Sequence, residues 1–154
     1  MADADYFYRG DGEGHFEPIP GQKSGIIAYG DQRGAALSDF NGDGKVDFAL
    51  SQNAAATKLF LNQVEKQGFS VQLRGPANDS AAISSGIRLV YADGSEGPRR
   101  AIQAGGGYWS QNSATQVMGS NSVKPVQSIQ VTWSDGSTQE VPITENQNIY
   151  QIDY

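Results

Sequence analysis

The chain has 154 residues, a formal net charge of −6 and a sequence pI of about 4.6. It has no cysteine, which excludes a disulfide framework, a thiolate metal site and a cysteine nucleophile. Its acidic balance, with Arg99-Arg100 as the one adjacent pair of basic residues, argues against nucleic acid or an anionic membrane surface as a partner. No stretch is apolar enough to suggest insertion into a membrane.

The first part of the chain shows short alternating runs separated by Gly- and Asp-rich turns, which is typical of β-structure. No segment shows the sustained period of a helix. We predict strands at residues 6–8, 15–18, 25–29, 35–38, 46–51 and 58–62.

The alternation of apolar and polar residues is more regular in the second part of the chain. Apolar residues share one strand face in three runs: Phe69, Val71 and Leu73; Ile87, Leu89 and Tyr91; Ile129, Val131 and Trp133. The dipeptides Asp93-Gly94 and Asp135-Gly136 follow two of these runs and indicate hairpin turns. With further strands at 99–103, 141–144 and 148–154, the pattern predicts an antiparallel β-sandwich of seven or eight strands.

A candidate calcium loop lies at residues 39–47, between two of the predicted strands. Oxygen-bearing side chains occupy its positions one, three, five and nine, and a carbonyl would face inward at position seven. Gly44 occupies position six, where a sharp turn is needed. The predicted ligands are Asp39, Asn41, Asp43, the backbone of Lys45, and Asp47.

The loop is not an EF-hand, and an ordinary turn is the alternative to a calcium site. Leu50 replaces the bidentate glutamate that an EF-hand has at position twelve, so the loop joins strands instead of helices. The same residue types also dominate turns that bind no ion. Three carboxylates at close range repel one another without a cation, which favours the calcium site.

These residues resemble two known families. Residues 39–50, followed by 58–63, resemble the blade unit of FG-GAP/VCBS repeats, which form calcium-bearing β-propellers, and residues 6–19 are similar to the end of a preceding repeat. Residues 75–94, 104–113 and 126–141 resemble the ASPIC/UnbV domain. The resemblance implies a partial calcium-binding blade at 1–63 and an ASPIC/UnbV-like sandwich at 64–154.

The segment 105–112 places three glycines before two aromatic residues and several hydrogen-bonding side chains. One interpretation is a carbohydrate platform formed by Tyr108, Trp109, Gln111 and Asn112, in which a ring stacks on the sugar and amides meet its hydroxyls. The alternative, which the general burial of tryptophan favours, is that Tyr108 and Trp109 anchor the sandwich core. Trp133 is predicted to be a core residue because it is in phase with Ile129 and Val131.

Catalytic signatures are absent from the sequence. His15 is the only histidine, and we expect it on a strand surface; no nucleophile elbow, P-loop or dinucleotide fingerprint occurs. Paired carboxylates of a glycan-active enzyme are the least favoured alternative. Asp11 and Glu13 are candidates for a second, incomplete cation site.

We therefore expect a non-catalytic, calcium-binding adhesion or binding module whose ligand is an extracellular glycan or protein. An extracellular or cell-surface location is expected because the resembled families are mostly secreted and weak calcium loops fill only where calcium is abundant. Met1-Ala2-Asp3-Ala4-Asp5 lacks the features of a signal peptide, so the protein is either cytosolic or has had its signal peptide trimmed. We favour trimming, because the chain opens in the middle of a repeat pattern and the resembled families are mostly secreted. An unpaired blade edge would also permit self-association.

Overall fold

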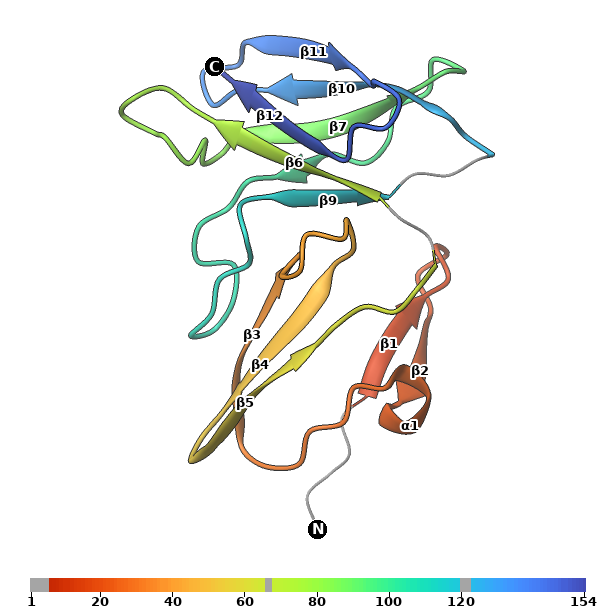
Figure 1. The fold of residues 1–154 in the computed structure, drawn as a ribbon, viewed down its shortest axis with the longest axis vertical. Helices are drawn as coiled ribbons and strands as arrows, with labels where there is room; N and C mark the ends of the chain where they lie inside the picture. The colour runs from red at the N-terminus through yellow and green to blue at the C-terminus, as the bar shows by residue number, and fades with distance from the viewer. Residues whose placement is uncertain (1–5, 66–67, 120–122) are drawn as a thin grey trace.

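The computed structural model describes residues 6–65, 68–119 and 123–154, and within them the fold is almost entirely β (Figure 1). This confirms the predicted all-β class. The expectation about residues 1–5 lies outside the described residues. No helix in the described part is long and apolar enough to cross a membrane.

The N-terminal part contains a hairpin and a separate sheet of three antiparallel strands, in the order β3-β4-β5. Figure 1 shows both in the lower half of the molecule, with the hairpin beside the sheet. The elements are β1 (Tyr6–Gly10), β2 (Phe16–Pro20), α1 (Gly21–Ser24), β3 (Gln32–Ser38), β4 (Asp47–Gln52) and β5 (Ala55–Phe60).

The C-terminal part is a sandwich of two sheets, with the orders β11-β10-β7-β8 and β12-β6-β9. Its strands are β6 (Gly68–Arg74), β7 (Gly86–Tyr91), β8 (Arg100–Ala101), β9 (Gln116–Gly119), β10 (Val126–Thr132), β11 (Thr138–Pro142) and β12 (Ile149–Asp153). All its strand pairs are antiparallel except β12 with β6, which is parallel. The prediction of an antiparallel sandwich is therefore wrong for this one pair, because side-chain alternation indicates a strand but not the direction of its neighbour.

One hydrophobic core lies between the two sheets of the sandwich. Phe69, Val71 and Leu73 are buried together with Ile129 and other apolar residues of the facing strands, as the period of two predicts. Trp133 is also buried, which confirms its predicted place in the core. Its indole nitrogen donates a hydrogen bond to Gln139 Oε1 at 3.2 Å, so burial leaves no unsatisfied donor on this ring.

The two Asp-Gly dipeptides form hairpin turns of the same construction. Gly94 and Gly136 have φ of 78° and 87°, a left-handed conformation that costs glycine little. Asp93 and Asp135 each accept hydrogen bonds from the backbone nitrogen and hydroxyl of the serine two positions on. The serine hydroxyls and backbone amides lower the pKa of both carboxyl groups from the ordinary value of 3.8.

The predicted strand at residues 25–29 is wrong. Gly25 ends helix α1 with φ of 77°, and the carbonyl oxygens that follow are used by side chains instead of a neighbouring strand. Ile27 O accepts a hydrogen bond from Lys58 Nζ at 2.8 Å, and Ala28 O accepts one from Gln32 Nε2 at 3.1 Å. The segment therefore belongs to no sheet.

Two further elements were not predicted. Helix α1 is a single turn, too short to show a helical period. Strand β9 has four residues, and Met118 alone among them is buried, so its alternation is too brief to identify. The other strands match their predicted positions with shifts at their ends, for example at β3, β5 and β11, each of which begins earlier than predicted.

Ile129 provides a test of the sandwich core, because its side chain is fully buried between the sheets. Ile129→Ala should lower the free energy of unfolding by about 2–5 kcal/mol through lost burial and the cavity left behind. Urea unfolding followed by circular dichroism measures this loss. Gln127→Ala, at an exposed position of the same strand, should change stability by no more than about 0.5 kcal/mol. Equal losses in the two variants would contradict the burial of Ile129 in the sandwich core.

Candidate functional site

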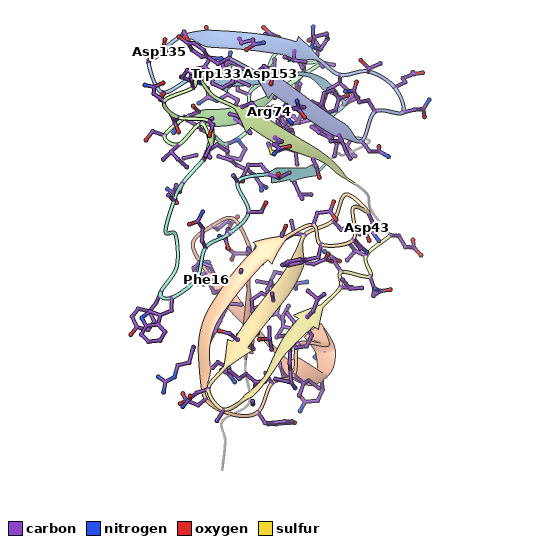
Figure 2. All side chains as sticks on the ribbon, turned by 60° about the vertical axis from the view of Figure 1, so that its left-hand side comes forward. Phe16, Asp43, Arg74, Trp133, Asp135 and Asp153 are labelled. Carbon is purple, nitrogen blue, oxygen red and sulfur yellow. The ribbon has the colours of Figure 1, made fainter. Side chains whose placement is uncertain are left out.

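The candidate calcium loop connects β3 to β4 at the point where the N-terminal sheet meets the sandwich. Figure 2 shows Asp43 at this junction. Gly68 N, at the start of β6, donates a hydrogen bond to Gly44 O at 3.2 Å. Ser70, buried on the face of β6 that points away from the core residues Phe69 and Val71, places its hydroxyl 3.4 Å from Asp39 Oδ2. The loop therefore contacts the sandwich directly.

Asp39 organises the backbone of the loop. Its Oδ1 accepts hydrogen bonds from Gly42 N at 2.7 Å and Asp43 N at 3.0 Å, and its Oδ2 accepts one from Gly44 N at 2.8 Å. Gly42 and Gly44 have φ of 75° and 77°, which allows the chain to coil tightly around this carboxylate. The first-position residue of the predicted site thus fixes the loop backbone through three hydrogen bonds.

Asn41, Asp43 and Lys45 line the outer part of the loop. Asn41 Nδ2 donates to Asp43 Oδ2 at 3.0 Å, and Lys45 Nζ lies 3.3 Å from the same oxygen. The hydrogen bond from the Asn41 amide, together with the Lys45 charge and backbone amide, lowers the pKa of Asp43 from 3.8. Asp43 is therefore ionised at neutral pH, and the ammonium group of Lys45 lies beside it.

Asp47 has a different environment from the other predicted ligands, because it is almost completely buried, with 1% of its surface exposed. Its Oδ2 accepts a hydrogen bond from Phe40 N at 2.9 Å and its Oδ1 accepts one from Asn62 N at 2.8 Å. These bonds connect the start of the loop to the chain after β5. Asp47 is thus a structural anchor as well as a candidate ligand, a role that residue spacing could not reveal.

The donor set suits a hard cation in its chemistry, and the loop backbone is already coiled as such a site requires. The carboxylates are less converged than a filled site needs, since Asp39, Asp43 and Asp47 do not come within 4.8 Å of one another as a set. Asp39, Asn41, Asp43, Asp47 and the carbonyl of Lys45 are the groups that could hold the ion. An ion would have to draw these oxygens inward and compete with the Lys45 ammonium.

A second acidic group lies in the turn between β1 and β2. Among the described residues, Asp11, Glu13 and His15 form the one set of three potential ligands within 4.8 Å of one another, and all are exposed. Asp11 accepts hydrogen bonds from Glu13 N, His15 N and the His15 ring. These bonds form a tight turn, which explains why the three side chains lie close together. The sequence had suggested Asp11 and Glu13 but not His15.

The four residues of the predicted carbohydrate platform do not act together in the structure: the two aromatic residues and the two amides have different environments. Trp109 is 80% exposed and Tyr108 is 74% exposed, so the interpretation that they anchor the core is wrong. Their rings stack on each other, with centroids 5.7 Å apart and an interplanar angle of 25°. We call this pair the aromatic tip of the β8–β9 loop.

Gln111 and Asn112 hold the loop that presents this tip. Gln111 Oε1 accepts a hydrogen bond from Gly105 N at 3.4 Å, closing the loop. Asn112 Oδ1 accepts one from Leu37 N at 3.0 Å, and Leu37 O accepts one from Ser113 N at 3.0 Å. The loop is therefore docked on the edge of β3, and these two amides do not form a continuous platform with the rings.

The aromatic tip contains one of the residues with a strained backbone. Trp109 has φ of 53°, a left-handed conformation that costs a non-glycine residue roughly 1–2 kcal/mol. An exposed indole gains little from packing to offset this cost. A strained, exposed aromatic residue is a reason to look for a ligand-binding role.

The structure is thus that of an all-β module with a candidate cation loop and an exposed aromatic tip. A family model described as "ASPIC and UnbV" matches residues 75–154, and the chain belongs to this family. The chain is also 34% identical over 87 residues to cartilage acidic protein 1 of Xenopus tropicalis. This alignment covers 56% of the chain and 13% of that relative.

Gly42 and Gly44 provide a matched test of how the loop docks. Both have positive φ, but a Cβ at Gly44 would lie 2.9 Å from Gly68 O, whereas a Cβ at Gly42 meets no atom within 4 Å. Gly42→Ala should cost about 1–2 kcal/mol of stability through backbone strain alone. Gly44→Ala should cost clearly more, because the β6 backbone must also move. Urea unfolding measures both, and equal losses would contradict the packing of the loop against β6.

Proposed function

We propose that this chain is a non-catalytic, calcium-binding module that acts outside the cell as an adhesion or ligand-binding unit. The observation that supports it best is the coil of the loop around Asp39, with Asn41 and Asp43 placed along its outer part. Calcium would neutralise the acidic side chains and hold the loop in one conformation. Since the loop also contacts β6, an ion bound there would stiffen the connection between the two parts of the chain.

We also propose that residues 1–63 form part of an FG-GAP/VCBS-type blade. The antiparallel β3-β4-β5 sheet next to the loop is compatible with such a unit. Phe7, Tyr8 and Leu59 are exposed in this part, a distribution that suits a blade with neighbours. Its strand edges offer a surface for self-association or for a protein ligand.

Calcium binding is tested by thermal unfolding with excess calcium and with a chelator. At a calcium concentration of 100 times the dissociation constant, the bound ion should add about 2.7 kcal/mol of stability, which corresponds to a rise of roughly 5–10 °C in Tm. Asp43→Ala should abolish this rise, because it removes a partly buried candidate ligand without removing the hydrogen bonds of Asp47.

Asp93→Ala is the matched control for Asp43→Ala, since it removes an aspartate of similar hydrogen bonding from a hairpin turn distant in sequence. It should retain the full response to calcium. A parent protein whose Tm is the same in calcium and chelator would refute the proposed site, as would an undiminished response in Asp43→Ala.

A second candidate function is carbohydrate binding through Tyr108 and Trp109. The stacked, exposed rings and the strained backbone of Trp109 favour it. Aromatic faces stack on the apolar faces of sugar rings, and a rigid loop limits the entropy lost on binding.

Replacing Trp109 separates a ligand role from a structural one. Trp109→Ala should leave stability within about 0.5 kcal/mol of the parent, and Trp109→Gly should relieve the positive φ. Both variants should lose retention on polysaccharide affinity gels. Tyr29→Ala, which removes another exposed ring, is the control and should be retained normally. A loss of about 3–5 kcal/mol in Trp109→Ala would instead indicate a core role.

A further inference from the structure

A small cavity lies where the β8–β9 loop, the end of β3 and strand β9 meet. In Figure 1, β9 lies along the side of the sandwich nearest to the tops of β3 and β4. The cavity volume is about 150 Å³, below the roughly 300–1,000 Å³ of sites for drug-sized ligands. It is therefore of a size for a single sugar ring or a comparable small molecule. Its polar lining includes Ser38, Arg100, Gln103, Asn112, Thr115 and Gln116.

Arg100 is the one charged residue in this lining. Its Nη1 donates a hydrogen bond to Val117 O at 3.2 Å, which orients the guanidinium against β9. None of the ion pairs in the described part of the chain includes Arg100. In a protein with a net charge of −6, a guanidinium that lines a cavity and forms none of these ion pairs is available to pair with an anion. Its planar fork suits a carboxylate.

The other polar groups of the lining are amides and hydroxyls, which suit a ligand with several hydroxyl groups, and Leu37, Val46 and Val117 add apolar surface beside them. Asn112 uses its Oδ1 to accept a hydrogen bond from Leu37 N, so its Nδ2 is a donor that docking of the loop does not use. Gln103 and Thr115 contribute a further amide and a hydroxyl. Such groups select by hydrogen bonding, because a ligand without the matching hydroxyls would leave them unsatisfied.

We propose that this cavity binds a monosaccharide-sized carboxylate, either a free sugar acid or the acidic unit of a glycan, with Arg100 pairing with the carboxylate. The proposal rests on the role as a binding module proposed above, but it requires neither calcium nor the aromatic tip. Arg100 lies outside residues 39–47, so the two proposals can fail separately.

The test is a titration of the ¹⁵N-labelled protein with sodium D-glucuronate, D-glucose and sodium sulfate, in calcium and in chelator. Glucuronate should bind roughly tenfold or more tightly than glucose, the factor expected for a charge-assisted hydrogen bond, and should shift the amide signals of Ala101, Gln103 and Thr115. The Arg100→Gln variant should bind glucuronate about tenfold or more weakly than the parent protein, and so no more tightly than glucose. Arg99→Gln should not show this loss, because Arg99 bonds to Ser84 O and does not line the cavity.

Gly106 allows a second test that leaves Arg100 intact. It lines the cavity, and a Cβ there would lie 3.9 Å from Gln103 Oε1, with no closer contact. Gly106→Asp should weaken glucuronate binding at least as much as Arg100→Gln by placing a carboxylate near the guanidinium. Gly106→Asn, of nearly the same shape, should weaken it much less.

A glucuronate-terminated oligosaccharide distinguishes the two sources of the ligand. Tighter binding than the monosaccharide would assign the cavity to glycans, and weaker binding would assign it to free sugar acids. The proposal is overturned if glucuronate does not bind, if glucose or sulfate binds as tightly, or if Arg100→Gln and Arg99→Gln behave alike.

Discussion

Hydrogen bonding of backbone N–H groups to two aspartates is the interaction on which the N-terminal part depends. Asp39 accepts three bonds from the loop that follows it, and buried Asp47 connects the start of this loop to the chain after β5. A buried carboxylate is costly unless its oxygens are hydrogen-bonded, so these bonds also explain how Asp47 is tolerated. They give a short, polar loop one defined conformation in a region with few fully buried apolar side chains.

The same loop links the two parts of the chain, and the β8–β9 loop links them a second time. One contact joins Gly44 to Gly68, and the other joins Leu37 to Asn112 and Ser113. The candidate calcium site and the polar cavity therefore both border the junction. A ligand at either place would act on the relative mobility of the sheets as well as on its own surroundings.

The sequence predicted the sandwich well because its strands bury one face and expose the other, and the Asp-Gly turns follow a local rule. It failed at residues 25–29, where the Lys58 and Gln32 side chains, remote from the local pattern, take the backbone acceptors. Spacing alone suggested the candidate cation loop, but it could not reveal that buried Asp47 bonds to Asn62, 15 residues away. The exposure of Trp109 was also beyond local reasoning, because it follows from the docking of its loop on β3.

The parallel pairing of β12 with β6 has a consequence for how the chain folds. Strand β6 opens the sandwich in sequence, yet both of its neighbours, β9 and β12, come later, and β12 ends at Asp153. During synthesis, β6 must therefore wait with its apolar face incompletely covered until the last strand is available. Pairings this distant slow folding because a long loop must close first. The segment 75–154 that matches the family model excludes β6, so on its own it would lack the central strand of one sheet.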